Sequence, residues 1–242
     1  MENNNYIEQL LEALKQADPL RIILFGSYVN GNQNENSDID IVVILDNNDV
    51  AKTYDERLKK KLYINRLVRN INYKIALDIF VYSKEEYKII KNNGNYFIDE
   101  IENTGKIIYE KASWRWIKFA EKDILTISEI ISNPNLTNIV AFHCQQAIEK
   151  YFKAFILEKE KPIIKIHNLL TLYGTIKEIM KFDIDEDLLS RINDIYLESR
   201  YPGEIGLLDD GSMPTIKQAE QFYTFAKEIK KKIKNKLNCN QK

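Results

Sequence analysis

The sequence predicts an α+β protein of two domains, a small mixed sheet flanked by helices and then an all-α helical bundle. Strand and helix patterns alternate only in the first part of the chain. From Trp114 onward five helical stretches follow, with no convincing strand among them. No internal repeat or low-complexity tract interrupts this order. We therefore expect one domain over residues 1–111 and a second over residues 112–242.

The predicted N-terminal domain begins with a helix and contains four strands. Apolar residues at helical spacing indicate a helix over 6–16, which ends at Asp18-Pro19 because proline cannot continue a helix. Apolar runs predict three strands and two intervening helices, with "GKIIYE" as a short closing strand. The strands cover 21–25, 38–45 and 74–82, and the helices cover 50–70 and 84–103. Alternation in the third strand places Asp78 opposite its apolar residues, which are Ile75, Leu77, Ile79 and Val81.

The predicted C-terminal domain consists of helices over about 114–132, 137–159, 167–181, 186–199 and 215–237. The second of these has one apolar, core-facing stripe: Val140, Cys144, Ala147, Ile148, Tyr151 and Phe155. Its opposite face carries a polar row: His143, Gln146, Lys150 and Lys153. Two interpretations fit this row, a solvated helix face or a row of donors toward a nucleotide or a partner. In the second interpretation, Lys150 and Lys153 bind the nucleotide.

Composition excludes several classes of protein. The 35 Lys and Arg residues nearly balance the 36 Asp and Glu residues, so no global positive charge predicts binding to nucleic acid. The N-terminus is acidic and amphipathic, unlike a signal peptide, and the longest apolar runs are too short to span a membrane. Cys144 and Cys239 form no disulfide framework. We expect a cytoplasmic protein without a membrane partner.

Two aspartates stand at the start of the second predicted strand, in "SDIDIVVIL". Because residues two apart in a strand share a face, Asp38 and Asp40 point the same way while Ile39 points into the core. Close carboxylates repel each other unless a cation lies between them, and Mg²⁺ binds oxygen ligands of this kind. Asp78, on the off-core face of a later strand, is a third candidate ligand.

A Gly-Ser turn precedes the aspartates in the sequence. Gly26 and Ser27 directly follow the first strand, where glycine lets the backbone approach a ligand and exposed N–H groups can hold phosphate oxygens. An isolated Asp-x-Asp is most often only a turn at a wet sheet edge. Carboxylates beside a phosphate-holding turn instead indicate metal-assisted substitution at phosphorus. The Gly-Ser turn and Asp78 together favour this second interpretation.

The segment "GSYVNGNQNENSDIDIVV" resembles the signature of the DNA polymerase β-like nucleotidyltransferases, in particular their minimal prokaryotic members. "ALDIF" resembles the strand that carries their third carboxylate, and the resemblance covers about residues 6–110. It implies that Gly26 and Ser27 hold the β- and γ-phosphates of an NTP and that Asp38 and Asp40 hold two Mg²⁺ ions. It also implies that Asp78 binds the catalytic metal and helps to deprotonate the acceptor. Where many members have an arginine after Gly-Ser, this chain has Tyr28, Val29 and Asn30.

The segments "AFHCQQAIEKYFKAFI", "IHNLL" and "ESRYP" resemble the HEPN family of helical bundles, over about residues 114–237. HEPN domains are often encoded beside minimal nucleotidyltransferases or fused to them, and they commonly dimerise. Many are RNases with an Arg-x4–6-His motif. Arg200 matches the arginine, but the positions that would hold the histidine are occupied by Ile205, Gly206 and Leu207. We therefore do not expect ribonuclease activity.

The leading hypothesis is an Mg²⁺-dependent nucleotidyltransferase, with ATP as the expected NTP and pyrophosphate as the leaving group. The acceptor is a hydroxyl of a small molecule, as in antibiotic-modifying nucleotidyltransferases, or of a protein, as in toxin–antitoxin relatives that modify tyrosines. An alternative is a module that binds NTP without turnover in an antitoxin or defence role. A HEPN ribonuclease is the third hypothesis. We expect a homodimer formed through the helical bundle and no nucleic-acid partner.

Overall fold

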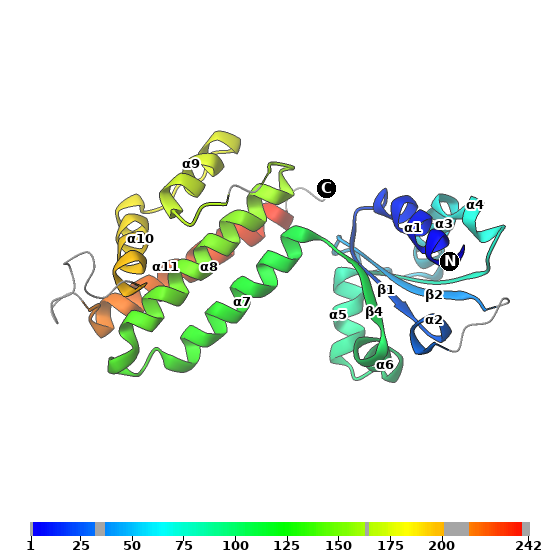
Figure 1. Ribbon diagram of the computed structural model, residues 1–242, viewed down its shortest axis with the longest axis horizontal. Coiled ribbons are helices and arrows are strands. Elements are labelled where there is room, and N and C mark those ends of the chain that lie inside the picture. The colour runs from blue at the N-terminus through cyan, green and yellow to red at the C-terminus, as the bar shows by residue number, and fades with distance from the viewer. Residues whose placement is uncertain (1, 32–36, 163–164, 201–212, 239–242) are drawn as a thin grey trace. The chain divides into compact units, whose positions relative to one another are not determined.

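The computed structural model describes residues 2–31, 37–162, 165–200 and 213–238. The chain divides into two compact units, Met1–Lys111 and Ala112–Lys242 (Figure 1). The first unit contains a sheet and the second is helical, so the α+β prediction for the chain is confirmed. Each unit is described by itself below.

The first unit is built on a four-stranded mixed sheet with the order β3-β2-β1-β4. Strand β1 (Pro19–Phe25) pairs antiparallel with β2 (Ile39–Leu45) on one side and with β4 (Lys106–Glu110) on the other. Strand β3 (Leu77–Ser83) pairs with β2 in parallel. The sheet therefore has two edge strands, β3 and β4, and the two acid-bearing strands are neighbours.

Helices cover both faces of this sheet (Figure 1). One face packs on α1 (Glu2–Lys15), α3 (Tyr54–Leu67) and α4 (Arg69–Asn72) through a common buried core. That core includes alternate residues of β2, namely Ile39, Ile41, Val43 and Leu45. The helices α5 (Lys84–Asn92) and α6 (Tyr96–Thr104) lie on the other side, and the short helix α2 (Ser27–Asn30) follows β1.

Several element boundaries differ from the prediction, and three of these differences have a local reason. Helix α3 begins at Tyr54 rather than near residue 50, because Thr53 and Glu56 form a capping box. Strand β3 begins at Leu77 rather than at residue 74, because a short helix occupies Arg69–Asn72. The single helix expected over 84–103 is two helices, since Gly94 adopts a φ of +68° between them.

The second unit is a bundle centred on α8 (Thr137–Glu158), which packs against four other helices. These are α7 (Ala112–Ile130), α9 (Leu169–Ile179), α10 (Glu186–Arg200) and α11 (Ile216–Asn238). A one-turn 3₁₀ helix, Pro134–Leu136, links α7 to α8. The apolar stripe predicted for α8 is buried in the common core. In the described residues no helix is both long and apolar enough to cross a membrane.

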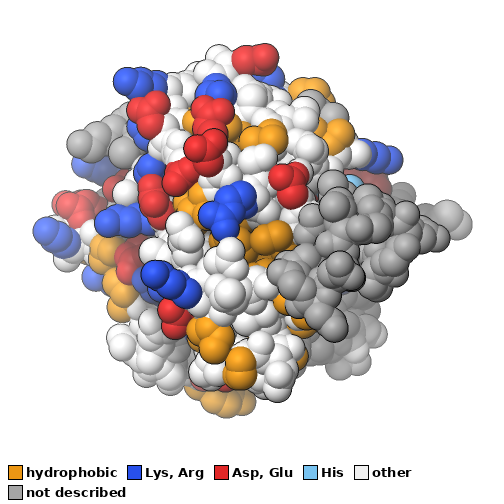
Figure 2. Space-filling model, turned by 90° about the vertical axis from the view of Figure 1, so that its left-hand side faces the viewer, with side chains coloured by type: hydrophobic (Ala, Val, Ile, Leu, Met, Phe, Trp, Pro, Cys, Tyr) orange, Lys and Arg blue, Asp and Glu red, His pale blue; other side chains and the backbone are white. Residues whose placement is uncertain are grey.

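The surface of the helical unit carries charges of both signs. On the face shown in Figure 2, Lys and Arg side chains are interspersed with Asp and Glu side chains. This mixed pattern agrees with the nearly balanced composition of the chain.

Candidate active site

The carboxylates of Asp40 and Asp78 come from neighbouring parallel strands. Each is the second residue of its strand, and the two are paired in the register of β2 and β3. Paired residues on adjacent strands point to the same face, and the strands lie about 4.8 Å apart. The sheet therefore brings together two of the acids predicted from sequence.

The environment of Asp40 disfavours its negative charge. Asp40 is half-buried, whereas Asp38 and Asp78 are exposed. Burial, followed by the negative charges of Asp78 and then Asp38, raises the pKa of the Asp40 carboxyl above its usual value. A cation beside Asp40 would relieve this repulsion, so the site favours a positively charged ligand.

Asp38 lies outside the paired residues of β2 and β3. It immediately precedes the first residue of β2, and its negative charge raises the pKa of Asp40 less than that of Asp78 does. In the described part of the chain, no three Asp, Glu, His or Cys side chains are grouped closely enough to hold a metal ion. The structure thus provides a paired Asp40 and Asp78, with Asp38 beside them rather than in one three-carboxylate cluster.

Gly26 lies directly against Asp40. Phe25, the last residue of β1, pairs with Asp40, and Gly26 follows with a φ of +69°. A Cβ added at Gly26 would meet Oδ2 of Asp40 and lie 3.0 Å from its carboxyl carbon. Ser27 begins α2 immediately afterwards. The predicted Gly-Ser turn and the carboxylate pair therefore belong to one site.

Replacing Gly26 with alanine should both strain the backbone and displace the Asp40 carboxylate. We expect a loss of about 1–3 kcal/mol in the free energy of unfolding, together with a large loss of any activity that depends on Asp40. Gly31→Ala is the matched control, because Gly31 also has a positive φ, of +73°, but an added Cβ there meets nothing within 4 Å. Unfolding followed by circular dichroism measures the first effect. Equal activity in the two variants would show that the contact with Asp40 has no functional role.

An aromatic cluster beside the aspartates was not predicted. Phe25, Phe80 and Phe97 pack together, with ring centroids 4.8 to 5.9 Å apart. Phe80 lies two residues after Asp78, so both side chains leave the same face of β3. This spacing was visible in the sequence, but the contribution of Phe97 from α6 was not. The cluster gives the carboxylate pair an apolar wall.

Each of the two lysines predicted to bind a nucleotide forms an ion pair with an acidic side chain inside the helical unit. Lys153 is buried, and its Nζ donates to Glu149 Oε1 at 2.7 Å while lying 5.2 Å from the centre of the Trp116 ring. Glu149 also accepts from Gln145 Nε2 at 3.1 Å and lies 3.0 Å from His167 Nδ1. Lys153 therefore does not lie on a solvated helix face. Its positive charge is already balanced by Glu149.

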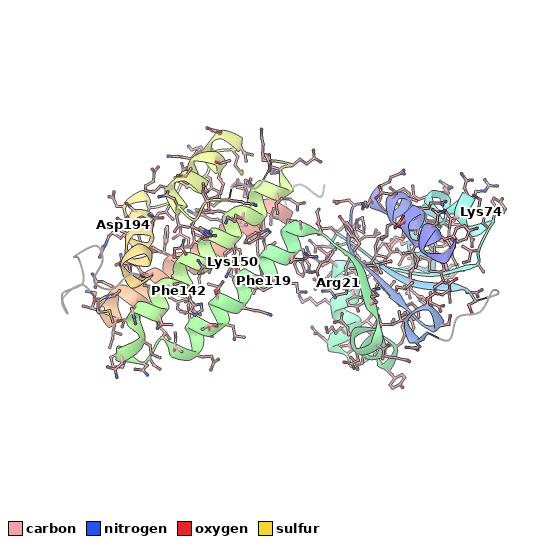
Figure 3. All side chains as sticks on the ribbon, in the orientation of Figure 1. Arg21, Lys74, Phe119, Phe142, Lys150 and Asp194 are labelled. Carbon is pink, nitrogen blue, oxygen red and sulfur yellow. The ribbon has the colours of Figure 1, made fainter. Side chains whose placement is uncertain are left out.

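Lys150 belongs to a second polar group on the same helix. Its Nζ donates to Asp123 Oδ2 at 2.5 Å, and His143 Nδ1 lies 2.9 Å from Asp123 Oδ1. Figure 3 marks Lys150 among the side chains between α7 and α8. The contact of Lys150 with a nucleotide stays a prediction. Of the residues compared with the ribonuclease motif, the Arg200 side chain and positions 205–207 lie outside the described part of the chain.

Comparisons with known families match both halves of the chain. The model of the nucleotidyltransferase domain family matches residues 7–76, which include Gly26, Ser27, Asp38 and Asp40. The model of the HEPN domain family matches residues 113–236, about half of the chain. The matched regions fall one in each compact unit.

Curated relatives carry adenylyltransferase names. Protein adenylyltransferase MntA of Aphanizomenon flos-aquae is 32% identical over 127 residues, covering 50% of this chain and 78% of the relative. A putative protein adenylyltransferase, MJ1305 of Methanocaldococcus jannaschii, is 30% identical over 122 residues, covering 49% of this chain and 79% of the relative. A second putative protein adenylyltransferase from the same organism, MJ0141, is 33% identical over 85 residues, covering 35% of this chain and 74% of the relative.

Proposed function

Because this chain belongs to the nucleotidyltransferase family and carries a HEPN domain after its nucleotidyltransferase domain, we propose that it transfers AMP from ATP to a hydroxyl group with the help of Mg²⁺. Transfer of a nucleotide is the activity of the family, and the chain is a nucleotidyltransferase enzyme. The nucleotide, the metal and the acceptor are the parts that we propose.

The observation that carries the proposal is the pairing of Asp40 with Asp78 in the sheet, with Gly26 against Asp40. A half-buried carboxylate, raised in pKa by burial and by two neighbouring acids, is a costly arrangement unless a cation is bound. The absence of a side chain at Gly26 leaves room beside Oδ2 of Asp40. Carboxylates that can hold a cation and a backbone that approaches closely at the same point are what a metal–triphosphate complex needs.

The donor set suits Mg²⁺, which typically takes one or two carboxylates and completes its shell with phosphate oxygens and water. Asp40 and Asp78 would hold one ion, and Asp38 with Asp40 a second. When bound, Mg²⁺ would neutralise negative charge that develops on the phosphates. Gly26 and Ser27 would hold the β- and γ-phosphates through backbone N–H groups and a hydroxyl.

In the proposed reaction the acceptor oxygen attacks the α-phosphorus of ATP. A bond forms between this oxygen and the α-phosphorus, the bond from the α-phosphorus to the oxygen that bridges to the β-phosphate breaks, and pyrophosphate leaves. The Asp78 carboxylate, the more exposed of the strand pair, accepts the proton of the hydroxyl. The names of the relatives favour a protein side chain as the acceptor over a small molecule.

The proposal is tested by incubating the protein with Mg²⁺ and each of the four NTPs labelled at the α-phosphate. We expect the α-phosphate label to be transferred with ATP while unlabelled pyrophosphate is released, and both to be abolished when EDTA removes the metal. Asp78→Asn should reduce the rate by about 10²- to 10⁴-fold, the usual contribution of a general base.

The matched control for this test is Asp99→Asn, which changes an exposed aspartate on α6 and should leave the rate unchanged. Calorimetry separates the alternative function from inactivity. If ATP binds but pyrophosphate is never released over a wide panel of protein and small-molecule acceptors, the chain is a nucleotide-binding module and the proposed transfer is wrong.

A further inference from the structure

The strand that carries Asp78 has a free outer edge. Among the residues that the structure describes, strand β3 is the last strand on its side of the sheet and pairs with β2 alone. The backbone N–H of Ile39 donates to the carbonyl of Ala76 at 2.9 Å, which fixes which residues of β3 face β2. In a parallel pair the backbone groups of alternate residues point to the same neighbour. The backbone N–H and C=O groups of Asp78, Phe80 and Tyr82 therefore point toward β2. The backbone groups of the residues between them point toward the outer edge.

Side chains cap this outer edge at both ends but not in the middle. The outward N–H of Leu77 donates to Asn72 Oδ1 at 3.1 Å, and that of Ser83 donates to Glu86 Oε2 at 2.8 Å. Between them, the outward groups of Ile79 and Val81 have no such partner within the described residues. Unpaired strand edges accept a further strand readily, and natural proteins usually block them. This short open stretch begins one residue after Asp78.

A cavity of about 350 Å³ runs along the open stretch. Four consecutive residues of β3, Ile79 to Tyr82, line it. Because neighbouring side chains leave a strand on opposite faces, a cavity that touches all four must lie along the strand edge. Its walls come from the first half of α3 and from α5, including Arg57, Lys61, Ile89 and Ile90.

The cavity has an ion pair in its lining and is basic along one wall. Lys60 Nζ lies 2.9 Å from Glu86 Oε1, and the backbone N–H of Ala51 donates to the same oxygen at 2.7 Å; all three residues line the cavity. Ile79, which also lines it, directly follows Asp78 in the sequence. On the α3 wall, Arg57 and Lys61 are exposed, and their side chains form no ion pair among the described residues. The edge therefore complements a negatively charged extended segment.

We propose that the outer edge of β3 is the docking site for the acceptor, which binds as an added strand and is an extended, acidic segment of a protein. This inference rests on the proposed AMP transfer and identifies the class of its acceptor. An added strand lies about 4.8 Å from β3, and directly opposed side chains have Cβ atoms about 5 Å apart on the same face. A hydroxyl residue opposite Asp78 therefore stands beside the carboxylate that accepts its proton.

The two faces of β3 define the pattern of residues in such an acceptor. The side chains of Phe80 and Tyr82 lie on one face of β3. On this face Phe80 packs on Phe97 of α6 and Tyr82 packs on Tyr87 of α5. Ile79 and Val81 leave the face of the α3 core. In the acceptor segment, the residues on either side of the hydroxyl residue therefore point toward Arg57 and Lys61 and should be acidic. The residues two positions away from the hydroxyl residue meet Phe80 and should be apolar.

The probes are short synthetic peptides with this pattern, Val-Glu-Tyr-Glu-Val and the same peptide with Ser in place of Tyr. Each is compared with a version that has Lys in place of Glu and with a version whose backbone amides are methylated. The measurement is kcat/KM for transfer of labelled AMP from ATP to the peptide by the full chain. We expect transfer to the acidic peptides, at least about fivefold less to the Lys versions because exposed ion pairs contribute modestly, and none to the methylated versions.

Two variants of the protein test the edge itself. Val81→Pro removes one outward N–H and leaves the bonds to β2, which Phe80 and Tyr82 make, and proline is tolerated at such an edge position. We expect about a tenfold loss of kcat/KM from the missing hydrogen bond. In case this variant does not fold, the double variant Arg57→Glu with Lys61→Glu should reverse the preference, so that the Lys peptides become better acceptors than the Glu peptides. Lys59→Glu, on the same helix but outside the cavity, should retain the original preference.

The possible outcomes separate this inference from the proposed function. If the wild-type protein binds Mg²⁺–ATP and releases pyrophosphate but labels none of the peptides, the docking site is wrong and the transfer activity stands. Equal labelling of Glu, Lys and methylated peptides, or an unchanged preference in the double charge-reversal variant, also overturns the docking site. If the protein neither binds nor turns over ATP, both proposals are wrong.

Discussion

Replacing Asp40 with asparagine is expected to lower the rate of AMP transfer by about 10²- to 10⁴-fold, because a metal-binding carboxylate supplies several kcal/mol of transition-state stabilisation. The fold should be retained. Burial and the charges of Asp78 and Asp38 already disfavour the Asp40 carboxylate, and asparagine removes that repulsion without changing the size of the side chain. The variant should therefore be at least as stable as the wild-type protein while being nearly inactive.

The control for Asp40→Asn is Asp49→Asn, which alters an exposed aspartate after β2 that has no contact with the site. Pyrophosphate release and thermal unfolding are measured for both variants. An inactive and clearly destabilised Asp40 variant would indicate that Asp40 holds the sheet together rather than a metal. An active variant would show that catalysis occurs elsewhere.

Replacing Glu149 with alanine should have the largest effect on stability, a loss of roughly 3–5 kcal/mol in the free energy of unfolding of the helical unit. The change leaves the Lys153 ammonium buried without a counter-charge, since both side chains are about 95% shielded from solvent. It also removes a hydrogen-bond acceptor from Gln145 and a contact from His167. An uncompensated buried charge is costly because the group loses its hydration and gains nothing in return.

This prediction can be measured on the full chain, because both tryptophans, Trp114 and Trp116, lie on α7. Their fluorescence in urea reports unfolding of the helical unit alone. Glu186→Ala is the control, since its ion pair with Lys177 is half exposed and should contribute less than about 1 kcal/mol. Replacing Glu149 with leucine and Lys153 with methionine together should restore much of the lost stability. A Glu149→Ala variant no less stable than the control would contradict the role given to this pair.

The two-part architecture and most residues of the candidate site could be predicted from the sequence because these predictions depend on local patterns. The alternation of apolar and acidic residues in "DIDIVVIL" and "ALDIF" was sufficient to place Asp40 and Asp78 on the off-core faces of two strands. What it could not provide was the pairing of those strands. The register that puts Asp40 beside Asp78 depends on long-range contacts, as does the edge position of β3.

The polar row on α8 shows where local spacing leads to a wrong interpretation. Spacing predicted Lys150 and Lys153 opposite the apolar stripe, but α8 packs against four helices and most of its residues are buried. The acids that pair with these lysines are Glu149, adjacent to Lys150 in sequence, and Asp123, from α7. Glu149 lies four residues before Lys153, so helical spacing does bring these two side chains together. The contribution of Asp123 and the burial of the Lys153–Glu149 pair depend on packing against other helices, which spacing within one helix does not show.

The most direct test of the central claim is a crystal structure of the protein with Mg²⁺ and a non-hydrolysable ATP analogue. We predict Mg²⁺ bound by the carboxylates of Asp40 and Asp78, with the β- and γ-phosphates at Gly26 and Ser27. A triphosphate bound in the helical unit instead, with no metal at Asp40, would contradict the claim.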